Sequence, residues 1–173
     1  MRVLVTYATK NGSTAGIAQV IGEELSKMGL DAEVRPVDEV RDVQPYGAVL
    51  LGSAIYFGRW RKEALRFGSR HAAELQGRPV WLFDSGPLNA SPDEGKNEPV
   101  VAAEELLRQM GARARVTFGG RLVPEDAGRF TRRLMESGKA GSFGDLRNLD
   151  RVRGWAHAIG KELQGAKPVE ALA

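Results

Sequence analysis

The sequence contains no cysteine, which excludes disulfide bonds, thiolate metal ligands and a cysteine nucleophile. It has two histidines, His71 and His157, so neither a histidine-based metal site nor a Ser-His-Asp triad is expected. Each histidine is expected at the surface or in a groove. No apolar run approaches the ~20 residues that a membrane-spanning helix needs, and the N-terminus carries no signal-peptide pattern. These absences favour a cytoplasmic location and a site without a metal ion.

The composition is that of an ordinary globular domain. The chain has 173 residues, of which 42% are hydrophobic and 27% charged. This length suits one domain with a sizeable core, expected over residues 1–164. Residues 165–173 are expected to form a flexible tail.

Strand-like and helix-like segments alternate along the whole chain. Apolar runs predict strands over residues 2–7, 31–36, 47–53, 79–84 and 114–123. Helical spacing predicts helices over residues 14–28, 61–75, 98–110 and 148–164. Such alternation indicates an α/β fold with a doubly wound parallel sheet.

A hydroxyl-rich turn follows the first strand, with the sequence Thr9-Lys10-Asn11-Gly12-Ser13-Thr14. The helix expected directly after it offers free N–H groups and a positive dipole end to an anion. Gly12 lets the backbone approach a phosphate closely. The turn matches neither the nucleoside-triphosphate loop nor the dinucleotide fingerprint. A plain capping turn, with Thr9 or Ser13 as N-cap, is the alternative.

The order Tyr7-x-Thr9-x-x-Gly12-x-Thr14-x-x-x-Ala18 resembles the FMN-phosphate loop of the flavodoxin family. The resemblance implies that the six residues of the turn hold the phosphate of FMN. It also implies a five-stranded sheet in the order 2-1-3-4-5. In such a sheet the ligand lies at the loops after the first and third strands.

The loop after the third strand, residues 52–60, is rich in aromatic residues. Three aromatic side chains within five residues suit stacking on a planar heterocycle, although they could instead belong to the core. Trp60 fits either interpretation, because it also continues the apolar stripe of the helix at 61–75. The cofactor contacts expected in this loop are Ser53, Ala54, Tyr56, Phe57 and Gly58.

The loop after the fourth strand is short and polar. In flavodoxins the corresponding loop lies against the pyrimidine edge of the flavin. The resemblance therefore implies that this edge is bordered by Asp84, Ser85, Gly86 and Asn89. The alternative is a plain surface loop.

Later segments resemble one branch of the flavodoxin superfamily, the menaquinone-dependent protoporphyrinogen oxidases. The matching segments are GSAIYFGRWRKEALRF at 52–67, FDSGPL at 83–88, FGGRL at 118–122 and GDLRNLDRVRGWA at 144–156. An insertion at 124–138 follows the fifth strand and is shorter and less aromatic than in that branch. Its main apolar residues are Phe130, Leu134 and Met135. We therefore expect at most weak peripheral membrane contact.

Positive charge is concentrated in two windows. The net charge is +3 and the pI about 9.4. Residues 56–70 hold five cations against Glu63, and residues 108–133 hold seven arginines against Glu125 and Asp126. Such windows attract acidic proteins or anionic lipid, or are simply solvated helix faces. No nucleic-acid recognition motif accompanies them.

Together these features predict an FMN-dependent redox protein. The favoured activity is an oxidoreductase acting on a small molecule such as a porphyrinogen or quinone. The alternatives are an electron carrier that serves a redox protein partner, or a non-redox FMN-binding module. In each case the flavin carries the chemistry, so no catalytic side chain is expected.

Overall fold

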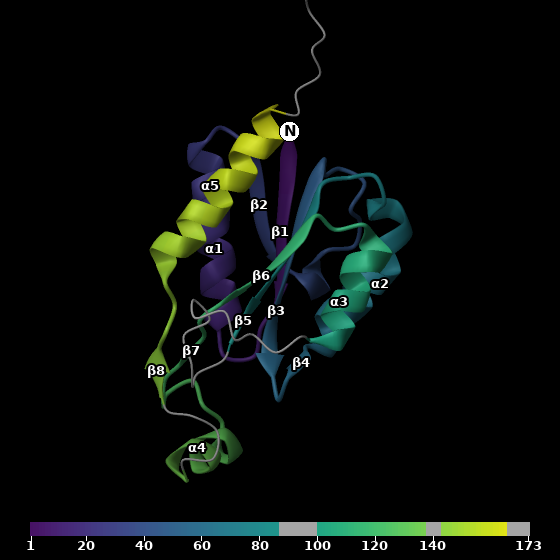
Figure 1. Cartoon of the computed structure of the whole chain (residues 1–173). Coiled ribbons are helices and arrows are strands. Elements are labelled where there is room, and N and C mark those ends of the chain that lie inside the picture. The colour runs from purple at the N-terminus through teal and green to yellow at the C-terminus, as the bar shows by residue number, and fades with distance from the viewer. Residues whose placement is uncertain (87–99, 138–142, 166–173) are drawn as a thin grey trace, which may run out of the picture.

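The computed structural model describes residues 1–86, 100–137 and 143–165. A parallel sheet forms its centre (Figure 1). The five parallel strands are β1 (Arg2–Ala8), β2 (Asp31–Pro36), β3 (Ala48–Tyr56), β5 (Val80–Ser85) and β6 (Ala114–Phe118). They are ordered β2-β1-β3-β5-β6, which is the predicted order 2-1-3-4-5. The extra strand β4 (Arg59–Trp60) pairs antiparallel with the end of β3.

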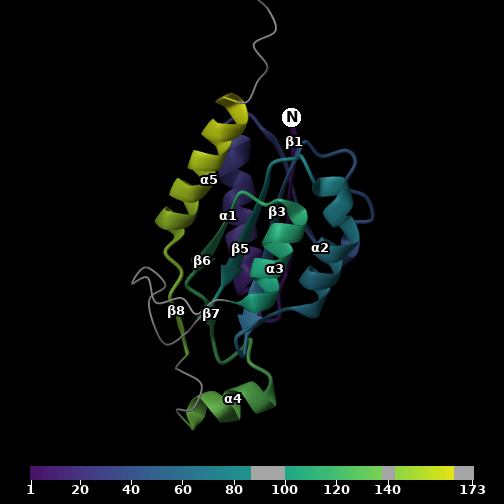
Figure 2. The same cartoon turned by 45° about the vertical axis from the view of Figure 1, so that its right-hand side comes forward.

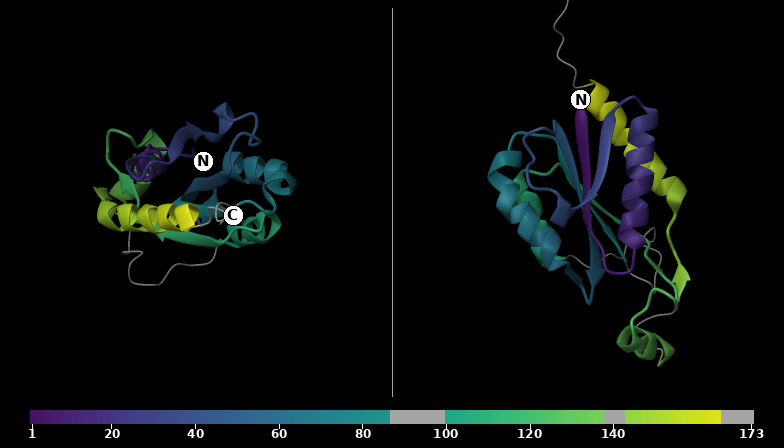
Figure 3. Two further views of the ribbon diagram at one scale, coloured as in Figure 1. Left: turned by 90° about the horizontal axis from the view of Figure 1, so that it is seen from above. Right: turned by 180° about the vertical axis from the view of Figure 1, so that it is seen from behind.

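Helices cover both faces of the sheet (Figure 3). One face carries α1 (Ser13–Lys27) and α5 (Leu149–Gly165), and the other carries α2 (Lys62–Leu75) and α3 (Val101–Met110). A short 3-10 helix, η1 (Val37–Glu39), follows β2. The predicted helices are confirmed within a few residues at each end, and α5 includes Gly165, the first residue of the expected tail.

The alternation of side chains in β1 divides the core into two layers. Val3 and Val5 pack with α1 and α5, whereas Leu4 packs with α2 and α3. Strands β3 and β5 are buried on both faces, as expected of central parallel strands. Because both layers are apolar, the polar groups of the sheet collect at the strand ends.

His71 corrects the expectation of a surface or groove position. Its side chain is buried on the inner face of α2 and packs on the Phe67 ring, with ring centroids 4.8 Å apart. Its Nδ1 lies 3.2 Å from Glu74 Oε1. The helical stripe that contains His71 points to the core, and the Nε2 of His71 is buried without a partner among the described atoms. His157 is exposed beside Glu24.

The expected fifth strand is shorter than predicted. It ends at Phe118, and β7 (Arg121–Leu122) leaves the main sheet to pair with β8 (Gly144–Asp145). Gly119 explains the departure, because a Cβ there would lie 1.9 Å from the carbonyl oxygen of Leu146. The chain segment after β8 therefore crosses directly over Gly119.

The insertion after β7 contains helix α4 (Arg129–Glu136). Figure 2 shows α4 projecting beyond the carboxyl ends of the strands. The side chains of Phe130, Leu134 and Met135, on which the expectation of weak membrane contact rested, lie outside the described part of the chain.

Among the helices of the described ranges, none combines the length and apolarity that crossing a bilayer requires. The same ranges contain no group of three or more acidic or histidine side chains placed to hold a metal ion.

Candidate functional site

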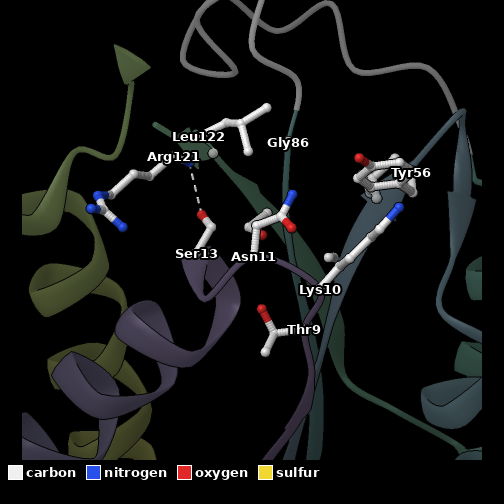
Figure 4. Close-up of a pocket in the computed structure, with 12 residues that line it drawn as sticks. Thr9, Lys10, Asn11, Ser13, Tyr56, Gly86, Arg121 and Leu122 are labelled. Carbon is white, nitrogen blue, oxygen red and sulfur yellow. Dashed lines mark hydrogen bonds between the residues drawn. The ribbon is translucent and has the colours of Figure 1, made fainter. Parts of the chain in front are cut away.

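A small pocket opens at the carboxyl edge of the sheet (Figure 4). It has a volume of about 60 Å³ and lies between the loop after β1, the ends of β3 and β5, and strand β7. The predicted site residues that line it are Thr9, Lys10, Asn11, Ser13, Ala54, Tyr56, Ser85 and Gly86. The structure therefore brings together residues from all three loops that the sequence indicated.

The N-terminus of α1 faces this pocket. Gly12 is the N-cap residue, with a φ of 77° in the left-handed region, and no side chain caps the helix. This corrects the alternative in which Thr9 or Ser13 is the N-cap. Ser13 Oγ instead accepts a hydrogen bond of 2.8 Å from the backbone N–H of Arg121, which fixes β7 against the helix (Figure 4). The first N–H groups of α1 are left for a ligand.

Thr9 Oγ1 is buried at the base of the pocket and has no hydrogen-bond partner among the described atoms. A buried hydroxyl without a partner costs free energy, so native structures rarely retain one without a reason. Its position next to the free end of α1 makes it a ready donor to an anion in the pocket.

Thr14 lies beneath the pocket. It is fully buried, and its Oγ1 lies 2.7 Å from Ser85 Oγ. This hydrogen bond joins the first turn of α1 to the end of β5. Thr14 therefore positions the loop, while Ser85 reaches the pocket itself.

Strands β3 and β4 form a tight hairpin beside the pocket. Tyr56 pairs with Arg59, and the two central residues, Phe57 and Gly58, have φ values of 49° and 69°. Positive φ at both central positions is the pattern of a type I′ turn, which glycine and asparagine favour. Phe57 occupies the strained first position and is 73% exposed. An exposed aromatic ring at a strained position is a candidate ligand contact.

Tyr56 lies between the hairpin tip and the hydroxyl-rich turn of residues 9–14. The Nζ of Lys10 stands 4.0 Å from the centroid of the Tyr56 ring, and the Phe57 ring meets Tyr56 edge-on at 5.3 Å. Figure 4 shows Lys10 extended toward this ring. A positive charge is thus held at the rim by a cation–π contact.

Two predicted contacts lie below the hairpin instead of lining the pocket. Asp84 is fully buried, and its Oδ2 accepts hydrogen bonds from Trp60 Nε1 at 3.0 Å and Arg115 Nε at 2.7 Å. Ser53 Oγ accepts one of 2.9 Å from the backbone N–H of Arg61. Trp60 is 3% exposed, which assigns it to the core. These residues support the hairpin.

Arg115 keeps its charge in this partly buried place. Burial lowers the pKa of Arg115, but the nearby carboxylates of Asp84 and Glu104 together raise it by more. The pKa of Arg115 therefore lies above its ordinary value. The guanidinium thus neutralises Asp84.

Sequence reasoning missed one wall of the pocket. Ile55, Gly120, Arg121 and Leu122 also line it. The Gly119-Gly120 pair inside a predicted strand was the available signal, because glycine there marks a bulge or a close approach. Of the predicted residues, Asn89 lies outside the described part, and Gly12, Phe57 and Gly58 adjoin the pocket without lining it.

A family model for the flavodoxin domain matches residues 4–143. The chain belongs to this family. Flavodoxin-type proteins bind FMN, and the carboxyl-edge pocket lies where the family's order of strands puts a ligand.

Protoporphyrinogen IX dehydrogenase [quinone] of Escherichia coli strain K12 is a curated relative of this flavodoxin-family chain. It is 26% identical over 109 residues, which are 62% of this chain and 60% of that protein. The same protein of Escherichia coli O157:H7 matches to the same extent. The chain thus aligns with less than two thirds of these relatives' length.

Solved structures share the fold at lower sequence identity. A flavodoxin from the domain Archaea has a TM-score of 0.65 at 17% identity, covering 95% of this chain and 99% of that one. Flavodoxin of Megasphaera elsdenii has a TM-score of 0.63 at 18% identity, covering 92% and 98%. Rubredoxin oxygen:oxidoreductase of Desulfovibrio gigas scores 0.64 at 16% identity, with 95% of this chain matching 36% of that one.

Proposed function

We propose that this chain is an FMN-dependent redox protein whose carboxyl-edge pocket holds the FMN phosphate. The observation that carries the proposal is the buried Thr9 Oγ1, which lacks a partner beside the free N-terminus of α1. A phosphate would accept hydrogen bonds from this hydroxyl and from the first N–H groups of the helix. The family match supports the same cofactor.

The volume of the pocket fits a site for the phosphate of FMN, with the flavin ring outside it. A volume of about 60 Å³ suits a small anion and is too small for a flavin ring. The ring therefore belongs at the rim, where Tyr56 and Phe57 present aromatic surface. Gly86 and Ser85, at the end of β5, supply small polar surface on the opposite side.

When bound, FMN supplies hydride and electron transfer. The chain's own residues bind and orient it. Lys10 adds positive charge at the rim, and the buried bonds of Asp84 and Ser53 hold the hairpin still. None of these residues needs to act as a general acid or base.

We further propose that a small molecule such as a porphyrinogen or quinone is the substrate. The curated relatives are protoporphyrinogen IX dehydrogenases that use a quinone, which supports this class. A groove of about 950 Å³ also adjoins the hairpin, and its lining includes Arg59, Lys62 and Leu65. Glu63 and Glu105 also line this groove, so its charge is mixed, and its apolar surface is what suits a planar substrate.

Comparing FMN with riboflavin tests the phosphate site. The purified protein should show flavin absorption or take up FMN, and Thr9→Val should weaken FMN binding roughly 10- to 100-fold, since one hydrogen bond to a charged group is worth about 1.5–3 kcal/mol. Riboflavin binding should not change. An equal loss for both ligands would contradict the assignment.

Thr6→Val is the matched control. Thr6 Oγ1 is also buried without a described partner, but Thr6 lies in β1 away from the pocket. The same substitution there should leave FMN affinity unchanged. Anaerobic reduction of the oxidised FMN-loaded protein by a porphyrinogen, followed by reoxidation of the reduced flavin with a quinone, then tests the substrate class.

A further inference from the structure

Three exposed cations lie along the outer side of α2 and a fourth precedes them in β4, and we call these four residues the α2 cationic stripe. Its members are Arg59, Lys62, Arg66 and Arg70. Residues 62, 66 and 70 follow each other at i, i+4 spacing, so they share one helix face. Figure 3 (right) shows α2 in front of α3, and α2 runs away from the β3–β4 hairpin.

No member of the stripe forms an ion pair within the described residues. The nearby carboxylate of Glu63 is bonded to Arg61 at 2.9 Å instead. Glu63 forms its ion pair with Arg61, and Arg66 also lies near enough to lower the pKa of the Glu63 carboxyl. The four cations thus remain exposed and in excess over the one carboxylate on this part of α2, Glu63.

Several arginines elsewhere on the surface are held in ion pairs. Arg2 bonds Glu33 at 2.7 Å, Arg147 bonds Asp145 at 2.6 Å, and Arg153 bonds Asp150 at 2.9 Å. Arg113 and Arg121 are likewise paired, with Glu162 and Asp126. Arg41, Arg129 and Arg133 are also exposed and have no ion pair among the described residues, so the stripe is distinguished by the close spacing of its cations and not by their lack of partners.

The stripe begins at the β3–β4 hairpin. Arg59 follows Gly58 directly, and the exposed ring of Phe57 stands at the tip. Tyr56, next to Phe57, lines the carboxyl-edge pocket. A molecule that docks on the stripe is therefore brought to the edge of the proposed flavin site, with one exposed aromatic residue as an anchor.

We propose that the α2 cationic stripe is the docking surface for an acidic redox protein that serves as the electron partner. This inference rests on the proposed function. Charge complementarity identifies the partner, because a row of unpaired cations steers and orients an acidic surface. A lipid surface fits less well, since α2 adds no large exposed apolar side chain to the stripe and interfacial binding needs a broad apolar face.

Binding of a small acidic [2Fe–2S] ferredoxin, used as the probe, tests the proposal. ¹⁵N-labelled protein, with and without FMN, is titrated at several salt concentrations. Amide shifts should concentrate on α2 and the hairpin, and affinity should fall steeply as salt rises. Arg66→Gln/Arg70→Gln should weaken binding about fivefold at low salt, because each exposed charge contributes about 0.5 kcal/mol.

Lys27→Gln/Lys161→Gln is the control of equal net charge. Both lysines are exposed and lie near the C-terminal ends of α1 and α5. These ends lie away from the hairpin (Figure 1). The control should bind the probe as the wild type does.

Three results would overturn the docking surface. If the stripe and control variants lose probe affinity equally, net charge alone determines binding. If the amide shifts caused by the probe lie away from α2, the contact surface is elsewhere. Loss of binding to phosphatidylglycerol vesicles in the stripe variant, with unchanged probe binding, would make the stripe a lipid surface. Because FMN uptake is measured separately, failure of the proposed cofactor remains distinguishable from failure of the stripe.

Discussion

The indole of Trp60 donates a hydrogen bond of 3.0 Å to the buried carboxylate of Asp84. One partner lies in the hairpin strand β4 and the other at the end of β5, so this bond joins the hairpin to the sheet. Arg115 binds the same carboxylate oxygen from β6. Three neighbouring strands thereby fix the position of the Phe57 turn.

Trp60→Phe should lower the free energy of unfolding by about 1–3 kcal/mol, because Asp84 loses a buried donor while most of the apolar area is kept. FMN affinity should also fall as the hairpin loosens. Urea titration measures the first effect and fluorescence titration the second. Trp81→Phe is the control, since Trp81 is buried in the other core layer and should leave FMN affinity unchanged. Equal FMN losses in both variants would argue against a positioning role for Trp60.

The turn residue Phe57 should show opposed effects on stability and binding. Phenylalanine at a φ of 49° is strained, whereas asparagine suits the same turn position. Phe57→Asn should therefore raise the free energy of unfolding by roughly 1 kcal/mol. If the Phe57 ring contacts the flavin, the same variant binds FMN more weakly. Unchanged FMN affinity would remove Phe57 from the site.

The sheet and its helices were predictable because their signals are local. The strands 47–53 and 79–84 are apolar on both faces, and the helix after Gly12 has a clear apolar period, so the elements followed from periodicity, whereas their order in the sheet followed from the resemblance to flavodoxins. The Thr9–Thr14 turn was predictable for the same reason. It stands at a strand end directly before a helix.

The interior supports of the site depend on contacts between distant residues. Asp84 was expected at the flavin, but its partners Trp60 and Arg115 stand 24 and 31 residues away. The wall formed by Arg121 and Leu122 depends on Leu146 crossing over Gly119. No periodic pattern reports such pairings, so sequence reasoning placed these loops without resolving which side chains face the pocket.

Gly119→Ala tests this crossing. Its Cβ would clash with the Leu146 carbonyl, so we expect a loss of about 1–3 kcal/mol in the free energy of unfolding and weaker FMN binding as β7 shifts. Thermal unfolding and FMN titration provide the readouts. Gly144→Ala is the control in the paired strand, because a Cβ there has open space. A Gly119→Ala protein with wild-type stability would show that the segment after β8 does not press on this residue.

Glu33 should make the fold sensitive to acid. The hydrogen bond from Tyr46, at 2.8 Å, lowers the pKa of Glu33 below its usual 4.5, and Arg35 and Arg2 lower it further against the opposing effect of burial. A lowered folded-state pKa contributes stability above the unfolded pKa, and that stability is lost as pH falls through the folded value. The urea midpoint should therefore decline as pH is lowered from about 5.

Tyr46→Phe should flatten this decline, because the pKa of Glu33 then moves back toward its ordinary value, and Glu33→Gln should remove the contribution of this residue. Near pH 7 both variants should be less stable than the wild type, and the differences should shrink toward pH 3. Urea titrations at fixed ionic strength between pH 3 and 7 make the comparison. Parallel curves for all three proteins would mean that Glu33 titrates alike in the folded and unfolded chains.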